Sequence, residues 1–236
     1  MREAQHERAM VLDEMHVFFL FDNSGSMTGQ RIQTLNEAME TLVPNMVSVA
    51  RSRGVTLFFH ALCFNTYIHW LCGSTAEKGV PMDQFHWHEI DAGGMTCTAD
   101  AIRAVLPGLS RRLLGRRTFR PIVILMTDGE SWDVRDTRAA IEEMKQVQKT
   151  TRIAIGVHGY NPKELDAFAS DGSVVMLDSF GEPVGEPVEQ KLVFSVMEAG
   201  QIAAVIRAAS LSSLVDTLDH PDAETVTVSA PSPEWL

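Results

Sequence analysis

Three short segments carry small oxygen-bearing side chains at spacings that suit the binding of a hard metal ion. In the first, Asp22, Ser24 and Ser26 alternate along the chain, so an extended loop would direct their oxygens to one side. Gly25, between the two serines, lets the loop turn without a side chain in its path. This segment alone is a weak indication of a metal site, because serine and aspartate also cap helices.

The two other segments supply the remaining oxygens. Thr96 follows Gly93 and Gly94, which allow a close approach of the backbone. Asp128 follows a short apolar run and precedes Gly129. The two carboxylates and three hydroxyls form an all-oxygen set that suits Mg²⁺, Mn²⁺ or Ca²⁺ and argues against zinc or copper. Because Mg²⁺ takes about six oxygens, a coordination position would stay open for an Asp or Glu of a partner protein.

The elements that position these residues follow from the apolar pattern. Residues 15–21 and 121–126 are nearly continuous apolar runs, as expected for strands buried on both faces of a parallel sheet. The predicted strands are 15–21, 55–64, 67–71, 121–126, 152–157 and 173–177, of which 67–71 is an antiparallel edge strand. Ligand sites of such sheets form at the carboxyl ends of the strands, where the three polar segments lie.

Helices are predicted between the strands. An apolar stripe at three- and four-residue steps, ending near Arg53 and Gly54, indicates the first helix, and Pro44 is expected to kink it. Further helices are predicted over 99–109, 135–148 and 162–169. The alternation predicts an α/β fold, a Rossmann-like doubly wound, mostly parallel sheet with one antiparallel edge strand and helices on both faces.

The pattern changes beyond residue 179. Residues 181–187 (GEPVGEP) are predicted as a turn-rich linker, and an Ala-rich helix is predicted over 196–217. The organisation we expect is an N-terminal extension over 1–14, the main domain over 15–180, a linker and C-terminal helix over 181–218, and a flexible tail over 219–236.

Charge and cysteine content narrow the class of protein. Acidic residues outnumber basic ones by 31 to 20, giving a net charge of −11, which disfavours nonspecific binding to nucleic acid or an anionic membrane. Three cysteines without a CxxC pair argue for a reducing compartment. Residues 1–14 do not resemble a signal peptide, and no apolar run approaches the ~20 residues that span a bilayer. The sequence predicts a cytoplasmic protein.

The polar set, with each part at the end of an apolar strand, resembles the metal-ion-dependent adhesion site of von Willebrand factor A domains. The resemblance covers residues 15–177 and implies that fold. It also implies that Ser24, Ser26 and Thr96 bind the ion directly, and that Asp22 and Asp128 bind it directly or through water. A protein-interaction module rather than an enzyme is therefore expected.

Within that superfamily the chain is most similar to TerY-type bacterial proteins. The phrases that carry this similarity are DNSGSMTGQRI, GGMTCTADAI, LMTDGESWD and RIAIGVHGYNPKELDAFA. The resemblance implies a stress-response, tellurite-resistance or defence-type assembly with kinase-like or phosphatase-like neighbours. A regulatory subunit of a kinase, phosphatase or AAA+ ATPase complex is the alternative.

A partner is expected to contact the rim of the metal site and a basic segment nearby. Five arginines between residues 111 and 120 form either a solvated helix end or a docking surface for an acidic or phosphorylated partner. The predicted contact residues are Asn23, Met27, Met95, Glu130, Trp132, Arg111, Arg112, Arg116 and Arg117.

Two other sites are indicated more weakly. A strand that ends in Asp22 superficially resembles haloacid-dehalogenase-type phosphohydrolases, but their general acid would stand at position 24, which is a serine. Ser24 also lies in no G-x-S-x-G motif. The segment from His86 to Glu89 could suggest a second metal site, but no matching Cys or His pair has zinc-like spacing.

Overall fold

The computed structural model describes residues 14–72, 79–110, 114, 118–147 and 149–232. Within these residues a seven-stranded sheet has the order β3-β2-β1-β5-β6-β9, and β4 also pairs with β2. Its strands are β1 (Glu14–Asp22), β2 (Thr56–Phe64), β3 (Ile68–Cys72), β4 (Val80–Pro81), β5 (Ile122–Thr127), β6 (Thr151–Val157) and β9 (Val193–Val196). The pairs of β2 with β3 and β4 are antiparallel and the others are parallel, so the predicted α/β sheet is confirmed.

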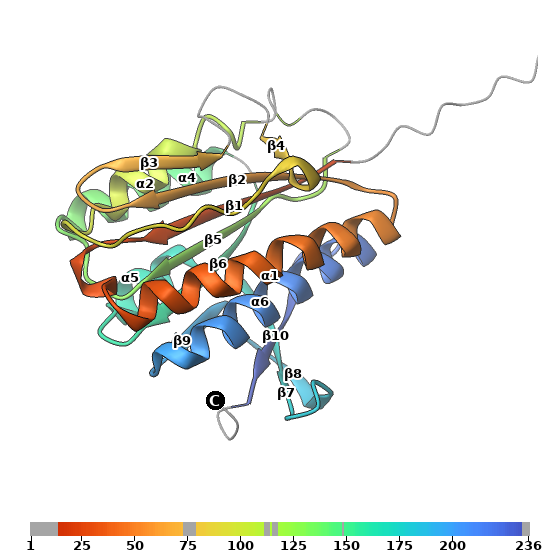
Figure 1. Ribbon diagram of the computed structural model, residues 1–236. Helices are drawn as coiled ribbons and strands as arrows, with labels where there is room; N and C mark the ends of the chain where they lie inside the picture. Colours follow the sequence, from red (N-terminus) through yellow and green to blue (C-terminus); the bar gives the residue numbers. More distant parts are fainter. Residues whose placement is uncertain (1–13, 73–78, 111–113, 115–117, 148, 233–236) are drawn as a thin grey trace, which may run out of the picture.

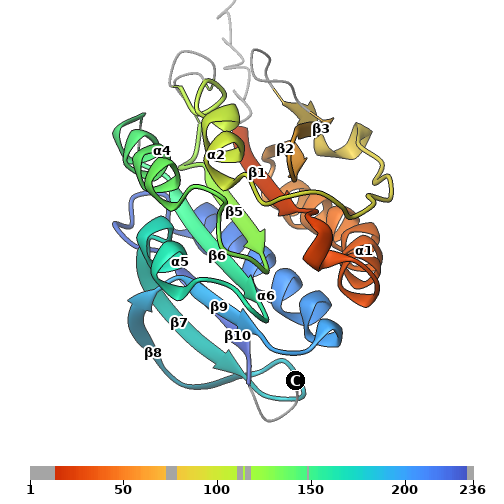
Figure 2. The same ribbon diagram turned by 90° about the vertical axis from the view of Figure 1, so that its left-hand side faces the viewer.

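Helices cover both faces of this sheet (Figures 1 and 2). One face carries α1 and α6, which lie side by side, and the other carries α2, α4 and α5. The bounds of these helices are α1 (Gln30–Ser52), α2 (Thr98–Val105), α4 (Val134–Val147), α5 (Pro162–Phe168) and α6 (Ile202–Asp219).

The apolar run of β1 is explained by burial on both faces. Val17, Phe19 and Phe21 pack in the core that contains α1 and α6. Phe18 and Leu20 point to the other side and pack with α2, α4 and α5. All five side chains are fully buried, and burial of each such residue contributes about 1.5–3 kcal/mol. These contacts bury β1 between the two layers of helices.

Helix α1 follows the predicted stripe. Ile32, Leu35 and Met39 are buried against the sheet. The helix continues past Pro44 to Ser52, and Gly54, with φ +68°, follows its end in a conformation that favours glycine. No helix in the described part of the chain is long and apolar enough to cross a membrane.

The order in which strands are added to the sheet changes side between the parallel neighbours β1 and β5. From β1 it continues through α1 to β2 on one side, and from β5 through α4 to β6 on the other. Phe21 of β1 pairs in parallel register with Met126 of β5, so Asp22 and Thr127 lie side by side. The two carboxyl ends therefore meet at a topological switch point, where open α/β sheets bind ligands.

The region after residue 170 differs from the expectation. Residues 173–177 were predicted as the last strand of the main sheet, but they lie in β7 (Asp171–Leu177) of a separate three-stranded sheet, and β9 takes the edge beside β6. The predicted linker forms β8 (Pro183–Lys191), which is antiparallel to β7. Its prolines are compatible with a strand because β8 lies at the edge of the small sheet, where fewer N–H groups are needed.

The C-terminal segment is also ordered differently. The Ala-rich helix α6 begins at Ile202, later than predicted. Where the sequence led us to expect a flexible tail, residues 227–231 form β10 (Thr227–Pro231), which pairs in parallel with β7. Val228 is fully buried in the core that also contains α6, and this burial holds the segment against the domain.

Candidate metal centre

Asp22 is a buried, hydrogen-bonded carboxylate at the switch point. Its Oδ1 accepts a 2.8 Å hydrogen bond from the Ser24 backbone N–H, and its Oδ2 accepts a 2.5 Å bond from the Thr127 hydroxyl. The residue has no solvent-exposed surface. The ends of β1 and β5 thus fix this carboxylate from two sides.

The two serines connect this loop to Asp128. The Ser24 and Ser26 hydroxyl oxygens lie 3.1 Å apart. The Ser26 hydroxyl donates a 2.6 Å hydrogen bond to Asp128 Oδ1. Residues separated by about a hundred positions in the sequence are therefore brought into one group of oxygen atoms, as the spacing predicted.

Thr96 lies on a third loop at the same edge. Its carbonyl accepts a 2.9 Å hydrogen bond from the Trp132 N–H, and a Cβ atom added to Gly129 would lie 3.3 Å from the Thr96 hydroxyl oxygen. The structure thus places Thr96 against the residue that follows Asp128.

Backbone contacts join the loop of Thr96 to the loop of the serines. The Gly25 N–H donates to the Gly94 carbonyl at 3.0 Å, and the Gly93 N–H donates to the Asn23 carbonyl at 2.7 Å. Gly94 has φ +86°, and a Cβ there would stand 2.8 Å from the Thr66 hydroxyl oxygen. A side chain at position 94 would therefore collide with the turn between β2 and β3 and would strain the backbone, which explains the glycine.

The electrostatics of the group favour a cation. Burial raises the pKa of Asp22, the nearby charge of Asp128 raises it further, and the hydrogen bonds from Thr127 and Ser24 oppose the rise. Arg31 already places a positive charge here, because its guanidinium forms an ion pair with Asp128 Oδ2. The same guanidinium donates to the Ser26 carbonyl at 3.2 Å.

The donor set fits a hard divalent ion. Carboxylate and hydroxyl oxygens are the ligands that Mg²⁺, Mn²⁺ and Ca²⁺ prefer, and the Arg31 guanidinium marks a position where positive charge is stabilised. No group of three or more His, Cys, Asp or Glu residues suited to a metal occurs within the described ranges, which include His86 and His88.

The predicted partner contacts divide into two groups. Trp132 is 75% exposed and Met95 is 42% exposed, and Glu130 is also exposed, although it accepts a hydrogen bond from Asn161. Asn23 and Met27 are buried, which contradicts their assignment as contacts. The Asn23 amide donates to the Asp91 carbonyl at 2.7 Å, and Met27 packs in the core. The predicted contacts Arg111, Arg112, Arg116 and Arg117 lie outside the described residues.

Two residues of the site were not predicted from the sequence. Arg31 is the second residue of α1, and Thr127 immediately precedes Asp128. The pairing of two strand ends signals Thr127, because it is the position opposite Asp22. Nothing in the local sequence signals that Arg31 contacts Asp128.

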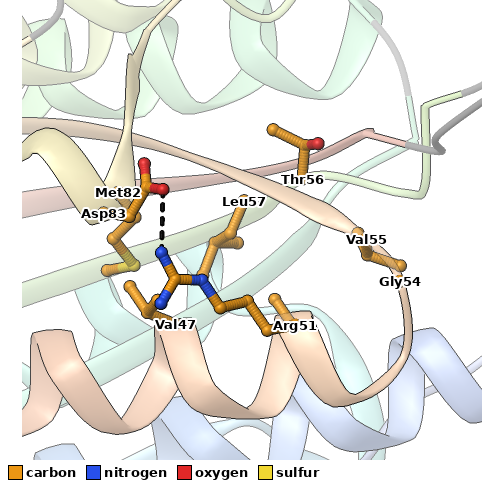
Figure 3. Close-up of a pocket in the computed structure, with 9 residues that line it drawn as sticks. Val47, Arg51, Gly54, Val55, Thr56, Leu57, Met82 and Asp83 are labelled. Atoms are coloured by element: carbon orange, nitrogen blue, oxygen red, sulfur yellow. Dashed lines mark hydrogen bonds and ion pairs between the residues drawn. The ribbon is translucent and has the colours of Figure 1, made fainter.

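A separate pocket lies at the far end of α1 (Figure 3). It encloses about 250 Å³ between Val47, Leu57 and Met82, and Arg51 pairs with Asp83 across it at 3.0 Å. Because α1 is about 34 Å long, this pocket is remote from the serine loop and does not belong to the metal centre.

Comparison with known proteins identifies the family. The sequence profile of the von Willebrand factor type A domain matches residues 16–190. The chain belongs to the von Willebrand factor type A domain family. No curated protein matched the chain. Domains of this family are typically metal-dependent binding modules for protein ligands and are generally non-catalytic.

Solved structures share the fold of this von Willebrand factor A domain. Proximal thread matrix protein 1 from the mussel byssus, with a zinc-occupied adhesion-site motif, is 17% identical, with a TM-score of 0.58 over 87% of this chain and 48% of that chain. A domain from Catenulispora acidiphila is 16% identical, with a TM-score of 0.54 over 88% and 43%. Manganese-loaded TRAP protein of Plasmodium vivax is 20% identical, with a TM-score of 0.50 over 66% and 63%.

The solved structures are longer than this chain, and two of them contain a metal. The chain spans about half the length of the first two structures, so the likeness concerns the domain and not those whole proteins. Metal-bound members hold zinc or manganese. Zinc also binds carboxylate oxygens, so the metals to be tested here include zinc.

Proposed function

We propose that this domain is an intracellular protein-interaction module that binds Mg²⁺, with Mn²⁺ or Ca²⁺ as alternatives, and uses it to bind an acidic residue of a partner protein. The ligands are Ser24, Ser26, Thr96, Asp22 and Asp128. The observation that carries the proposal is the Ser24–Ser26–Asp128 chain of oxygens beside buried Asp22, with a guanidinium already paired to Asp128.

Each residue of the site has a distinct role in this proposal. Asp22 is held by Ser24 N–H and Thr127, so its position is fixed before an ion arrives. Ser26 is exposed and Asp128 is buried, so the ion would be approached from the serine side. When bound, the cation would supply a Lewis-acidic position that a carboxylate of the partner completes.

The surroundings of the site support a binding function over phosphohydrolase activity. A phosphohydrolase with Asp22 as its nucleophile would need a general acid two residues later, and that position holds Ser24, whose hydroxyl oxygen lies 3.1 Å from that of Ser26. Trp132, which is exposed near Thr96, offers the aromatic surface that protein interfaces favour.

The first test is thermal unfolding of the wild type and Asp128→Asn, with EDTA and then with millimolar Mg²⁺, Mn²⁺, Ca²⁺ or Zn²⁺. An ion that binds the folded state alone stabilises it by about 2.7 kcal/mol at 100 times its dissociation constant. We expect this stabilisation in the wild type and not in Asp128→Asn. Asp100→Asn is the matched control, because Asp100 is exposed and outside the oxygen group.

Two outcomes would count against the proposal. Equal stabilisation of the wild type and Asp128→Asn would place any bound ion elsewhere. An absent response in the wild type, followed by partner capture from cell extract that EDTA leaves unchanged, would remove the role of the metal. Capture that requires both a divalent ion and Asp128 would support the whole proposal and supply the partner for identification.

The cellular setting is a further part of the proposal. The likeness to TerY-type sequences suggests a bacterial stress-response, tellurite-resistance or defence-type assembly, in which kinase-like or phosphatase-like proteins are the first partners to test. The three cysteines are free thiols, which suits the cytoplasm. A subunit of a kinase, phosphatase or AAA+ ATPase complex is the alternative, and the identity of the captured partner distinguishes the two.

A further inference from the structure

A basic pocket lies at the opposite edge of the sheet from the metal centre. It encloses about 520 Å³ and is formed where β5, β6 and β7 begin, where α4 ends and where the chain approaches β10. Its basic side chains are Arg120, Lys145, Lys149 and Arg152.

The charge of this pocket is opposite to that of the whole protein. Four basic side chains and two acidic ones line it, although the chain carries a net charge of −11. One acidic residue, Asp171, already pairs with Lys191 at 2.8 Å, and one lysine, Lys145, pairs with Glu142 at 2.7 Å. The charges that remain are the positive ones of Arg120, Lys149 and Arg152 and the negative one of Glu224, so the pocket stays positive.

Both arginines are held in place by oxygen atoms without formal charge. Arg120 donates to the carbonyls of Ala223 and Glu224, and Arg152 donates through Nε to the Phe168 carbonyl at 2.8 Å. Neither has a carboxylate at ion-pair distance among the described residues. Burial lowers the pKa of both arginines, and the carboxylates of Asp216 and Glu224 near Arg120 and of Glu142 and Asp171 near Arg152 oppose this fall. Arginine stays protonated in proteins, so both positions carry a fixed positive charge.

Two neighbouring groups are free to bind a ligand. The Arg152 Nη2 and the Lys149 ammonium have no hydrogen-bond partner within the described part of the chain. Lys149 is exposed and follows the end of α4. These donors can therefore be used by a ligand without breaking an existing contact.

A buried hydroxyl gives independent evidence for a ligand. Thr151 lines the pocket, is only 2% exposed, and its hydroxyl oxygen has no hydrogen-bond partner. Leaving a buried hydroxyl unpaired costs about 1–3 kcal/mol, so such groups usually have a partner. A bound ligand that accepts a hydrogen bond would satisfy it.

We propose that the pocket formed by Arg120, Lys149, Thr151 and Arg152 binds a phosphate group. Several donors lining one pocket match the several acceptor oxygens and the double charge of phosphate better than a single carboxylate. No aromatic side chain lines the pocket within the described residues, so no surface for stacking a nucleobase is present. The phosphate comes either from a small molecule or from a phosphorylated side chain.

The experiment measures binding of inorganic phosphate to the full chain by calorimetry and thermal unfolding. EDTA is present throughout, so the metal centre does not contribute, and chloride keeps the ionic strength constant. The variants are Lys149→Gln, which removes an exposed charge, and Thr151→Val, which replaces the unpaired hydroxyl with a methyl group of similar size. Lys163→Gln is the control, because Lys163 is exposed on α5 and does not line the pocket.

We expect phosphate to stabilise the wild type and Lys163→Gln equally. Its affinity should fall about tenfold in Lys149→Gln and about threefold to tenfold in Thr151→Val, as the loss of a charged and a neutral hydrogen bond predicts. Stronger binding of a phosphoserine peptide than of inorganic phosphate would identify a phosphorylated protein as the source, and weaker binding would identify a small molecule. No binding to the wild type, or equal binding to both pocket variants and the wild type, would overturn the proposal.

Discussion

The two edges of the central sheet carry resident charges of opposite sign. At the carboxyl ends of β1 and β5, Asp22 and Asp128 lie among hydroxyl groups. At the amino ends of β5 and β6, Arg120, Arg152 and Lys149 lie together. The two proposals follow from this difference: a cation is expected at the first edge and a phosphate at the second.

The connections of the fold explain why each edge tolerates its charges. Helices α1 and α4 begin at the carboxyl edge, and the partial positive charge of a helix N-terminus stabilises carboxylates nearby. Helix α4 ends at the amino edge, where its partial negative charge favours lysine, and Lys145 and Lys149 stand there. In a doubly wound sheet the helix ends thus give the two edges partial charges of opposite sign, independently of the side chains.

The largest effect is expected from Asp22→Asn at the carboxyl edge. The substitution keeps the shape of the side chain but removes a charge that the metal site needs, so metal affinity should fall at least about a hundredfold, or about 2.7 kcal/mol. Metal titration by calorimetry measures this loss. The phosphate response at the amino edge should not change, because the two sites lie at opposite ends of the strands.

The metal response and the phosphate response are expected to be independent of each other. A loss of both metal and phosphate binding in folded Asp22→Asn would mean that the edges are not independent. Circular dichroism and the unfolding midpoint in EDTA show whether the variant is folded. The oxygen of Asn at position 22 can accept from the Ser24 N–H, and its amide group can donate to the Thr127 hydroxyl oxygen, so a native fold is expected.

The second prediction concerns His60, which is buried in the interior between the two edges and is held in its uncharged form. His60 of β2 lies 3.0 Å from His16 of β1, ring nitrogen to ring nitrogen, and stacks on Phe18. Burial, and then the nearby His16, lower the pKa of His60 to about 3. The facing ionisable groups are His16 and Glu14, which lie 4.0 Å apart.

The sign of the pH effect follows from this lowered pKa. Between about pH 6.5 and 3 the unfolded chain protonates His60 and the folded chain does not, so the stability present above pH 6.5 is lost as the pH falls. At pH 4.5 the loss from this group is about 2.5 kcal/mol. Urea unfolding at pH 7 and pH 4.5 should show a smaller decrease for His60→Gln than for the wild type. Exposed His69→Gln is the control, and a decrease in His60→Gln equal to that of the wild type would refute the assignment.

Strands β1, β2, β5 and β6 of the central sheet were predictable because they are buried on both faces. Such strands have continuous apolar runs, and the polar residues at their ends were also predictable, because parallel strands align their carboxyl ends. The small sheet was missed for the opposite reason. Strand β8 is exposed along its whole length and contains two prolines, so it has neither an apolar run nor an alternating pattern. Strand β10 depends on pairing with β7, about fifty residues earlier, which no local pattern signals.

The contacts of the metal centre show the same limit of sequence analysis. Motif spacing identified Asp22, Ser26 and Asp128 as neighbours, and the structure brings them together. Burial of Met27 was not anticipated, because its position within the motif loop suggested exposure. It is fully buried because the 3₁₀ turn over residues 25–27 directs its side chain into the core. The role of Arg31 depends on a contact with a residue 97 positions away.

The third prediction concerns the charge of Arg31 at the carboxyl edge. Arg31 places a positive charge on Asp128 that a divalent ion would replace, so Arg31 should compete with the ion. The variant Arg31→Gln should bind Mg²⁺ or Mn²⁺ about tenfold more tightly, which corresponds to about 1.4 kcal/mol. Calorimetric titration measures this change. Arg51→Gln is a suitable control, because it removes an equal charge from the far end of α1. Unchanged affinity in Arg31→Gln would show that the guanidinium and the ion bind without competing.

The smallest effect on the domain itself is expected from Trp132→Ala, the change that best separates metal binding from partner binding. Trp132 is 75% exposed, so its removal should change the free energy of unfolding by no more than about 0.5 kcal/mol. Metal affinity should change less than twofold, because only its backbone N–H contacts the site, through the Thr96 carbonyl. Capture of the metal-dependent partner should nevertheless weaken, because exposed aromatic residues are frequent anchors of interfaces. If Trp132→Ala retains full partner binding while Asp128→Asn abolishes it, recognition depends on the metal-bound carboxylate and the interface does not include the α4 side of the site.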